Sequence, residues 1–123
     1  MKHATQKYKV LPLPAVEKLA KKILTDEQRR AAIRIARELE DFPNVQHLDL
    51  EKCGEGTRVA FRSPEINKQG WLRGVFWIVI YFVDIFWKKT NKVATADLIR
   101  ISHRIRGLRA ELAKGIKPWA KAA

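Results

Sequence analysis

The 123-residue chain is poor in the residues that build disulfides and metal centres. Its one cysteine, Cys53, cannot form an internal disulfide or a cysteine-based metal cluster, and such cysteine usage is typical of a reducing compartment. The three histidines, His3, His47 and His103, are scattered and lack the spacing of paired zinc ligands. Glycine-rich phosphate-binding motifs are also missing. We therefore expect a cytoplasmic protein with no metal and no cofactor.

The sequence also has no apolar run long enough to cross a bilayer. The longest run extends from Val75 to Val83 and is interrupted by Asp84, whereas a membrane-spanning helix needs about 20 apolar residues. The segment from Met1 to Lys7 carries charges with no apolar stretch behind them, which argues against a secretory signal. We expect this protein to have no membrane partner.

Acidic residues are few: the chain has 13 Asp and Glu against 25 Lys and Arg, a formal net charge of +12. Such an excess favours a polyanionic partner, whether nucleic acid, an acidic membrane surface or an acidic protein. Hydrophobic residues make up 46% of the chain, which is typical of a folded domain. We predict one domain over residues 1–123, with its core at about residues 7–113 and a mobile tail at 114–123.

The first third of the chain predicts a short strand followed by two helices. Lys7 to Leu11 alternates weakly, and Leu13 to Leu24 has apolar residues at three- and four-residue spacing. Thr25 and Gln28 have the spacing of a capping box, so a second helix should begin there and end before Phe42 and Pro43. The two helices should form a hairpin.

The middle of the chain predicts a sheet. We expect strands at Leu48 to Leu50, at Thr57 to Ser63 and within Trp71 to Trp87, with a polar loop at Pro64 to Gly70. The strand at Thr57 to Ser63 should direct Val59 and Phe61 to one face and Arg58, Ala60 and Arg62 to the other. The long segment to Trp87 has no glycine or proline to mark a hairpin turn, and we place its reversal near Tyr81 to Asp84.

A last amphipathic helix is predicted from Thr95, as its N-cap, to Leu112. Leu98, Ile101 and Ile105 belong to its apolar stripe, which must pack against the rest of the domain or bind a partner. Gly107 interrupts this helix, and we expect it to allow close approach of a neighbouring element.

Basic residues concentrate in the second half of the chain. If the strands pair in order, Arg62, Arg73 and the Lys88–Lys89 pair come from neighbouring strands and could converge on a phosphate backbone. The alternative is a set of separate, solvated charges. The aromatic side chains between Trp71 and Trp87 are expected in the core, with Trp87 as the best candidate for an exception.

Three segments carry a resemblance to a known family. They are Arg58-Val59-Ala60-Phe61-Arg62, Arg73-Gly74-Val75-Phe76-Trp77-Ile78 and Phe86-Trp87-Lys88-Lys89-Thr90-Asn91-Lys92. With the helical hairpin before them and the amphipathic helix after them, they resemble the RelE/ParE toxin superfamily, in particular its HigB-like, phage-derived branch. The resemblance covers about residues 8–112. It implies an α+β fold, in which a small antiparallel sheet has an N-terminal helical hairpin on one face and a C-terminal amphipathic helix.

The resemblance also implies a function, that of a toxin of a type II toxin–antitoxin system. The toxin would inhibit translation as a metal-independent mRNA endoribonuclease, free or on the ribosome, and a cognate antitoxin would inhibit it and provide any contact with DNA. Arg62 and Arg73 would clamp the phosphate, while Lys88 and Lys89 would stabilise charge or transfer a proton. Arg58, Lys68, Lys92 and Trp87 would bind RNA, and Leu98, Ile101 and Ile105 would bind the antitoxin.

The sequence leaves several alternatives open. Arg58 could pair with an acidic residue, Lys89 could cap the following helix, and the stripe that includes Leu98 could be intramolecular core. A non-enzymatic, ParE-like inhibitor of DNA gyrase would have the same fold. A small basic nucleic-acid-binding module would also account for the charge.

Overall fold

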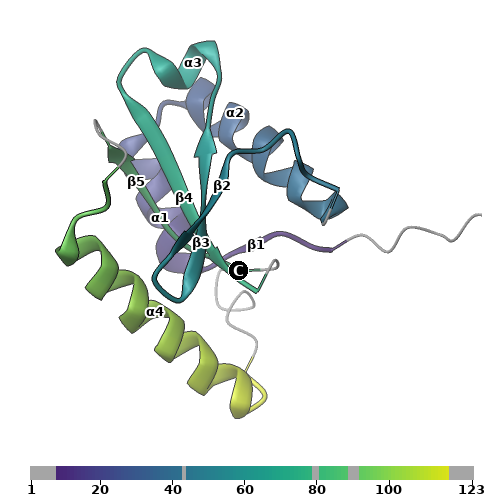
Figure 1. Ribbon diagram of the computed structural model, residues 1–123, viewed down its shortest axis with the longest axis vertical. Helices are drawn as coiled ribbons and strands as arrows, with labels where there is room; N and C mark the ends of the chain where they lie inside the picture. Colours follow the sequence, from purple (N-terminus) through teal and green to yellow (C-terminus); the bar gives the residue numbers. More distant parts are fainter. Residues whose placement is uncertain (1–7, 43, 79–80, 89–91, 117–123) are drawn as a thin grey trace, which may run out of the picture.

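The structure, a computed structural model, describes residues 8–42, 44–78, 81–88 and 92–116. It confirms the α+β class: four α-helices accompany a five-stranded sheet in the order β1-β5-β4-β3-β2 (Figure 1). The strands are β1 (Leu11–Pro12), β2 (Leu50–Cys53), β3 (Gly56–Phe61), β4 (Trp71–Trp77) and β5 (Tyr81–Lys88). The helices are α1 (Pro14–Ile23), α2 (Asp26–Arg37), α3 (Pro64–Asn67) and α4 (Thr95–Ala113), and a 3₁₀ turn, η1 (Glu38–Asp41), follows α2.

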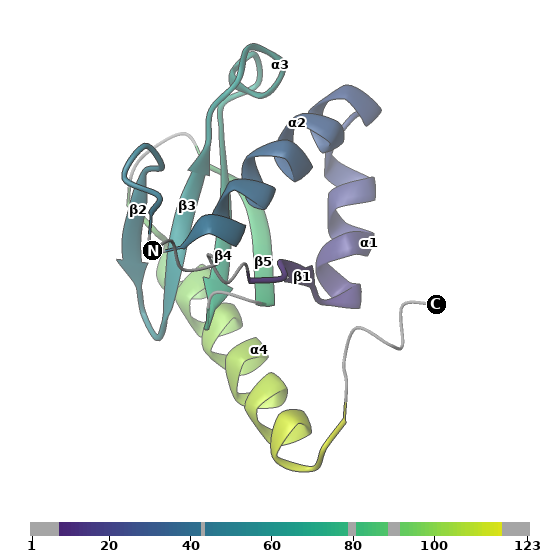
Figure 2. The same ribbon diagram turned by 90° about the vertical axis from the view of Figure 1, so that its right-hand side faces the viewer.

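The sheet has a hydrophobic core on each face. One core joins Val59, Phe61 and Leu72 to α1 and α2, and the other joins Val75 and Val83 to α4. Figure 2 shows α1 and α2 together on one side of the sheet, while α4 crosses its lower end and α3 lies at the opposite end. One end of the face that α4 packs on is therefore left open. No helix in the described part of the chain combines the length and the apolar character needed to cross a membrane.

The predicted capping box forms at the start of α2. The Thr25 backbone N–H donates to Gln28 Oε1 (3.0 Å), and the Gln28 N–H donates to Thr25 Oγ1 (3.2 Å). Two N–H groups at the helix start thereby gain partners. Gln28 is buried and also donates from Nε2 to the carbonyl of Glu65 (3.2 Å), which ties α2 to α3. The helical hairpin is confirmed, with α2 continuing into η1.

Strands β2, β3, β4 and β5 pair antiparallel in chain order. This order is the one that the predicted convergence of Arg62, Arg73 and the Lys88–Lys89 pair requires. The first strand differs from its prediction: β1 is confined to Leu11 and Pro12 and pairs parallel with β5. Pro12 is tolerated there because an edge strand has donors that need no partner in the sheet. β2 begins at Leu50 rather than at Leu48, and Gly54, with φ of 58°, makes the turn into β3.

The predicted reversal at Tyr81 to Asp84 is wrong. These residues lie within β5, and the chain turns after Trp77, at Ile78, whose φ is 48°. Ile78 gives no sequence signal for this turn because branched residues rarely adopt positive φ. Asp84 interrupts an apolar run in the sequence, yet it is fully buried.

Two smaller predictions also need correction, and a third falls largely on residues that the structure does not describe. The predicted loop at Pro64 to Gly70 contains α3, which begins where Ser63 Oγ accepts a hydrogen bond from the Ile66 N–H (3.3 Å). The N-cap of α4 is Ala94, without a side-chain cap, and Thr95 is its first residue. The predicted mobile tail begins at residue 114, and its residues 117–123 lie outside the described part of the chain.

Close approach occurs at Gly74 and not at Gly107. A Cβ added to Gly107 would meet nothing within 4 Å, so the prediction for this residue is wrong. A Cβ added to Gly74 would lie 2.5 Å from Phe61 Cε2 and 2.8 Å from Phe82 Cε1. The two phenylalanine rings fill the space over Gly74, so a side chain at this position would clash with them.

Replacing Gly74 with alanine is therefore expected to destabilise the fold. Forcing a methyl group against two packed rings should lower the free energy of unfolding by about 1–3 kcal/mol. Gly107→Ala is the matched control and should raise the stability by about 0.5–1 kcal/mol, because alanine favours a helix and has open space there. Urea denaturation followed by circular dichroism measures both. Equal effects of the two substitutions would contradict this account of Gly74.

Candidate functional site: an arginine pocket on the sheet

A polar pocket opens on the face of the sheet that α4 covers only in part. It has a volume of about 220 Å³. The residues that line this arginine pocket are Asp49, Glu51, Arg58, Ala60, Arg62, Trp71 and Arg73. The register explains why they share one face: Glu51 is opposite Arg58, and Ala60 is opposite Arg73, on adjacent antiparallel strands. Thus three of the predicted cationic residues, Arg58, Arg62 and Arg73, meet in one place.

The three arginines differ in burial and in their contacts. Arg58 and Arg73 are buried within β3 and β4, whereas the side chain of Arg62, just beyond β3, is 64% exposed. Arg58 forms an ion pair with Glu51, which confirms the alternative that it pairs with an acid. Arg62 Nη2 donates to Asp49 Oδ2 (2.8 Å). Two carboxylates therefore lie among the three guanidinium groups.

The guanidinium groups of the arginine pocket repel one another, which favours binding of an anion. Burial lowers the pKa of Arg73, and the positive charges of Arg58 and Arg62 lower it further. Arginine nevertheless stays protonated at neutral pH, because its ordinary pKa lies far above 7. Asp49 and Glu51 offset part of this repulsion. A phosphate group entering the pocket would gain guanidinium donors whose geometry suits its oxygens.

Trp71 provides an aromatic surface at the rim of the arginine pocket. It is 40% exposed, and the Arg73 guanidinium lies over its ring at 5.1 Å from the centroid. The prediction that Trp71 belongs to the core is therefore wrong. It lies at the start of β4, where α4 does not cover the sheet, so its ring can contact a ligand.

Sequence reasoning missed the two carboxylates of the pocket. Asp49 and Glu51 flank Leu50 and thus project to the same face of the chain in extended conformation. This spacing was the available signal. It could not be used without the register, because the pairing of β2 with β3 decides which face the two residues occupy.

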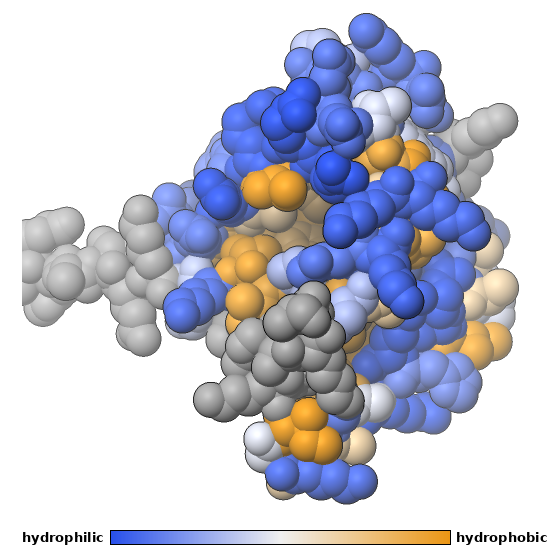
Figure 3. All heavy atoms as spheres, turned by 180° about the vertical axis from the view of Figure 1, so that it is seen from behind, coloured by the Kyte–Doolittle hydropathy of each residue, from blue (hydrophilic) through white to orange (hydrophobic). Residues whose placement is uncertain are grey.

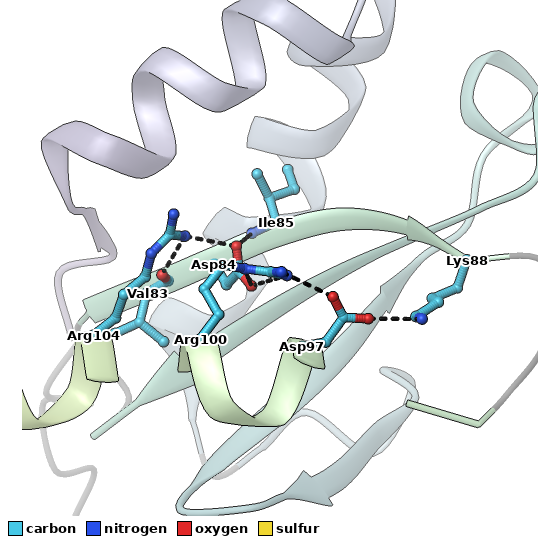
Figure 4. A network of polar contacts seen from close by, with 7 residues as sticks. All are labelled: Val83, Asp84, Ile85, Lys88, Asp97, Arg100 and Arg104. Carbon is cyan, nitrogen blue, oxygen red and sulfur yellow. Dashed lines mark hydrogen bonds and ion pairs between the residues drawn. The ribbon is translucent and has the colours of Figure 1, made fainter. Parts of the chain in front are cut away.

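Lys88 lies on the same sheet face but belongs to a different set of contacts. It is opposite Trp71 in the register, and its Nζ lies 2.7 Å from Asp97 Oδ2. Asp97 also pairs with Arg100, which in turn contacts the buried Asp84 of β5 (Figure 4). Lys88 does not line the arginine pocket. Its position suits it to holding α4 on the sheet, and Lys89 lies outside the described residues.

The ion network under α4 is centred on Asp84. Arg100 donates to Asp84 Oδ2 from Nε (2.9 Å) and Nη2 (2.7 Å), and Arg104 donates to Oδ1 (2.7 Å). Arg104 also donates to the carbonyl of Val83 (3.1 Å). Val83 is an extra residue in the pairing of β5 with β4, a β-bulge that directs this carbonyl away from the ladder. Figure 4 shows these side chains converging between the strand and the helix.

The remaining predicted RNA-binding residues lie apart from the pocket. Trp87 points to the opposite face of the sheet, where it packs against the core under α1 and α2, and its Nε1 donates to the carbonyl of Ile23 (3.3 Å). Lys68 is exposed after α3, and Lys92 is exposed between β5 and α4. None of the three lines the pocket.

The predicted antitoxin-binding residues face the interior. Ile101 and Ile105 are buried in the core between α4 and the sheet, and Leu98 packs at its edge. The structure thus supports the alternative that this stripe is intramolecular core. A partner could reach Ile101 and Ile105 only if α4 left the sheet.

The ion pairs of Asp97 make stability depend on pH. Burial opposes ionisation of Asp97, but hydrogen bonds from Lys88 and Arg100 outweigh it and hold its pKa below the ordinary value of 3.8. A carboxyl group with a lowered pKa in the folded state stabilises the fold above its unfolded pKa. That contribution is lost as the pH falls below about 4, through the folded pKa.

Asp97→Asn is therefore expected to be less stable than the wild type at pH 7 and to approach it below pH 4. The other carboxyl groups are the same in both proteins, so the difference in the free energy of unfolding between wild type and Asp97→Asn reports on Asp97. The measurement is urea denaturation of both proteins across this range of about pH 3–7. A difference that stays constant over the whole range would contradict the assignment.

Comparison of the chain with family models, with curated proteins and with solved structures found no match. Within residues 8–42, 44–78, 81–88 and 92–116, no three His, Cys, Asp or Glu side chains gather as a metal site requires.

Proposed function

We propose that the chain is a metal-independent mRNA endoribonuclease and acts in the cytoplasm as the toxin of a type II toxin–antitoxin system. The observation that carries the proposal is the arginine pocket, in which three guanidinium groups, two carboxylates and an exposed indole line one cavity. These are the groups needed to bind a phosphate, to accept a proton and to stack on a base. The resemblance of the chain to HigB-like toxins agrees with this chemistry.

RNA cleavage without a metal uses the ribose 2′-hydroxyl as nucleophile. A base takes the hydroxyl proton, the 2′-oxygen attacks the adjacent phosphorus, and the bond to the 5′-oxygen breaks. The products are a 2′,3′-cyclic phosphate and a 5′-hydroxyl, which gains a proton from solvent in the open pocket. Negative charge grows on the phosphate oxygens in the transition state, so fixed cations accelerate this step.

Arg73 and Arg62 would stabilise the phosphate in this scheme. Arg73 is held in β4 and 4% exposed, so its guanidinium is fixed before RNA binds. Such preorganisation is the main source of electrostatic catalysis. Arg62 is mobile enough in solvent to exchange Asp49 for a phosphate oxygen, since both partners of that ion pair are more than half exposed.

Glu51 is our candidate for the general base. Its carboxylate projects into the pocket from β2 and contacts Arg58, whose side chain is only 10% exposed and therefore well fixed. An oriented carboxylate beside the phosphate site can accept the 2′-hydroxyl proton. Lys88 is assigned to the contact with Asp97, and the predicted role of Lys89 stays a prediction.

Trp71 would stack on a base next to the cleaved phosphate. Stacking on an aromatic side chain is worth about 1–3 kcal/mol per base and tolerates any sequence. The arginine at 5.1 Å from its ring centroid makes the indole and the phosphate site neighbours. A cognate antitoxin with acidic side chains would inhibit by covering this same cationic face, and any contact with DNA would be made by the antitoxin.

The test is incubation of the purified chain with free mRNA in EDTA and, separately, with mRNA on ribosomes in a magnesium buffer. We expect cleavage under at least one condition, and its loss in the Arg62→Ala variant, which changes a side chain that is 64% exposed. Intact RNA under both conditions rejects the proposal. Inhibition of DNA supercoiling without RNA cleavage would identify a ParE-like protein, and salt-dependent RNA binding without cleavage would identify a binding module.

A further inference from the structure

The arginine pocket has an acidic end and an aromatic end. Asp49 and Glu51 lie just before and within β2, whereas Trp71 is the first residue of β4. The sheet order places β3 between these two strands. The carboxylates and the exposed indole therefore approach the pocket from opposite sides, with the arginine-bearing strand β3 between them.

Ala60 of β3 forms the floor between the two ends. It is opposite Arg73 in the register, and its backbone N–H donates to the carbonyl of Asp49 (3.2 Å). Arg58 and Arg62 are two residues away on either side of it and project to the same face of the strand. Guanidinium groups thus surround a side chain of one methyl group, which leaves room for a phosphate above Ala60.

Glu51 and Trp71 lie at diagonally opposite corners of this arrangement. Glu51 is opposite Arg58, at one end of the pocket. The antiparallel pairing of β3 with β4 makes Trp71 the neighbour of Arg62, at the other end. Two strand spacings and four residues along a strand separate the backbones of Glu51 and Trp71, roughly 16 Å. A phosphate above Ala60 would therefore have the carboxylate on one side and the indole on the other.

The reaction decides which nucleotide belongs at the acidic end. The attacking 2′-oxygen is part of the nucleotide on the 5′ side of the cleaved phosphate, and its proton passes to a carboxylate within hydrogen-bond reach. Both carboxylates of the pocket belong to the β2 side, so this ribose lies towards β2 whichever of them acts. The nucleotide on the 3′ side, which leaves with the 5′-oxygen, must then extend towards β4.

We propose that the RNA strand crosses the sheet in one direction, from β2 to β4, and that Trp71 stacks on the base 3′ of the cleaved phosphate. The inference rests on the proposed ribonuclease function and adds the direction of the strand. The Arg73 guanidinium occupies one face of the indole, 5.1 Å from the ring centroid, and the 40% exposure of Trp71 leaves surface for a base. Trp71 thus binds the leaving nucleotide rather than the one whose 2′-hydroxyl attacks.

The opposite side of the molecule has a different surface. A hollow between α1, α2 and the sheet has an apolar floor, and hydrophilic residues surround it (Figure 3). A phosphate chain loses hydration on an apolar surface without gaining hydrogen bonds in return. We therefore place the whole bound strand on the arginine-pocket face.

RNAs that lack one base test the direction. One RNA has an abasic nucleotide on the 5′ side of the cleaved bond, a second has it on the 3′ side, and the third is intact. All are compared under the condition that supports cleavage, at sub-saturating enzyme. We expect the 3′-abasic RNA to be cut about 5- to 150-fold more slowly than the intact RNA, the loss that corresponds to one stacked base.

The Trp71→Ala variant links this loss to one side chain. It should slow cleavage of the intact RNA by the same factor and have no further effect on the 3′-abasic RNA. It should slow the 5′-abasic RNA as much as the intact one, because that RNA still has the base that stacks. Trp71→Phe keeps an aromatic ring and should retain most of the rate. Tyr8→Ala, the control, removes an exposed ring that packs on Phe42 outside the pocket and should cut all three RNAs like the wild type.

A binding measurement reads the direction without cleavage. The probe is a six-nucleotide RNA with 2′-fluoro riboses, which has no attacking hydroxyl, and it carries a nitroxide at its 5′ or its 3′ end. NMR spectra of the full chain report which amide signals each nitroxide broadens. The 5′ label should broaden the signals of β2, such as Lys52, more than those of Gly70 and Trp71, and the 3′ label should do the reverse.

The two measurements separate this inference from the proposed function. If Trp71 couples to the 5′ base, or if the broadening pattern is reversed, the direction is wrong and the ribonuclease stands. If the wild type cuts no RNA, the ribonuclease is rejected and the broadening alone decides the direction of binding. Equal broadening by both labels would show that RNA binds in either orientation, which would overturn the inference.

Discussion

Asp84→Ala is expected to lower the free energy of unfolding by about 3–5 kcal/mol. Asp84 is fully buried, and Arg100 and Arg104 both contact its carboxylate. Removing the carboxylate takes away the charge that lies between the two guanidinium groups, and leaves Arg100 with its contact to Asp97 and Arg104 with its contact to the carbonyl of Val83. A buried charge deprived of its partner costs far more than a lost surface pair.

The control for this experiment is Arg109→Ala. Arg109 Nη2 lies 3.9 Å from Glu55 Oε2, and both side chains are exposed, so its removal should change stability by less than about 1 kcal/mol. Urea denaturation of the wild type and both variants gives the comparison. If Asp84→Ala loses no more stability than Arg109→Ala, the network does not hold α4 on the sheet.

Arg73→Ala is expected to lower the rate of RNA cleavage about 100- to 1,000-fold. That is the usual effect of removing one preorganised group that stabilises charge in the transition state. Arg73→Lys should restore only part of the rate, because lysine keeps the charge but cannot form two parallel hydrogen bonds with a phosphate. Single-turnover cleavage with excess enzyme measures the rate independently of product release.

The controls separate catalysis from folding. Because Arg73 is buried, circular dichroism must show that each variant is folded at the assay temperature. Arg106→Ala removes an exposed arginine on the outer side of α4 and should cleave like the wild type. Equal rates for Arg73→Ala and Arg106→Ala would remove Arg73 from the proposed site.

The elements with strong local signals were predictable from the sequence. The capping box at Thr25 fixed the start of α2, and the apolar spacing of α4 predicted both its extent and its buried stripe. The capping box and the helical spacing depend on neighbours in the sequence, where capping chemistry and periodicity act directly. The α+β class was implied by the family resemblance, and pairing in chain order was the condition for bringing the basic residues together. The structure confirms both the class and the order from β2 to β5.

The turn between β4 and β5 could not be predicted because its signals are tertiary. Asp84 lies inside β5, where Arg100 and Arg104 from a distant helix make its burial possible. Ile78 takes positive φ although its side chain disfavours it. The residue types around this turn therefore give no local signal that places it at Ile78.

The candidate site was predicted in part. The arginine pocket brings together Arg58, Arg62 and Arg73, as the strand order required. Lys88 instead forms an ion pair with Asp97. The exposed tryptophan is Trp71 and not Trp87, the one that was expected. Trp71 and Trp87 lie in adjacent strands on opposite faces of the sheet, and only the register decides which of them meets solvent. The carboxylates of Asp49 and Glu51 depend on the same register.

The central claim is that the arginine pocket cleaves RNA through the ribose 2′-hydroxyl, and the ends of the cleaved RNA test it most directly. The measurement compares an RNA with the same RNA carrying a single 2′-deoxynucleotide at the cleavage position, as free RNA in EDTA and, separately, on ribosomes in a magnesium buffer. We predict that the first is cut to a 2′,3′-cyclic phosphate and a 5′-hydroxyl and that the second stays intact at that position. Cleavage of both at the same rate, or of neither, would contradict the account.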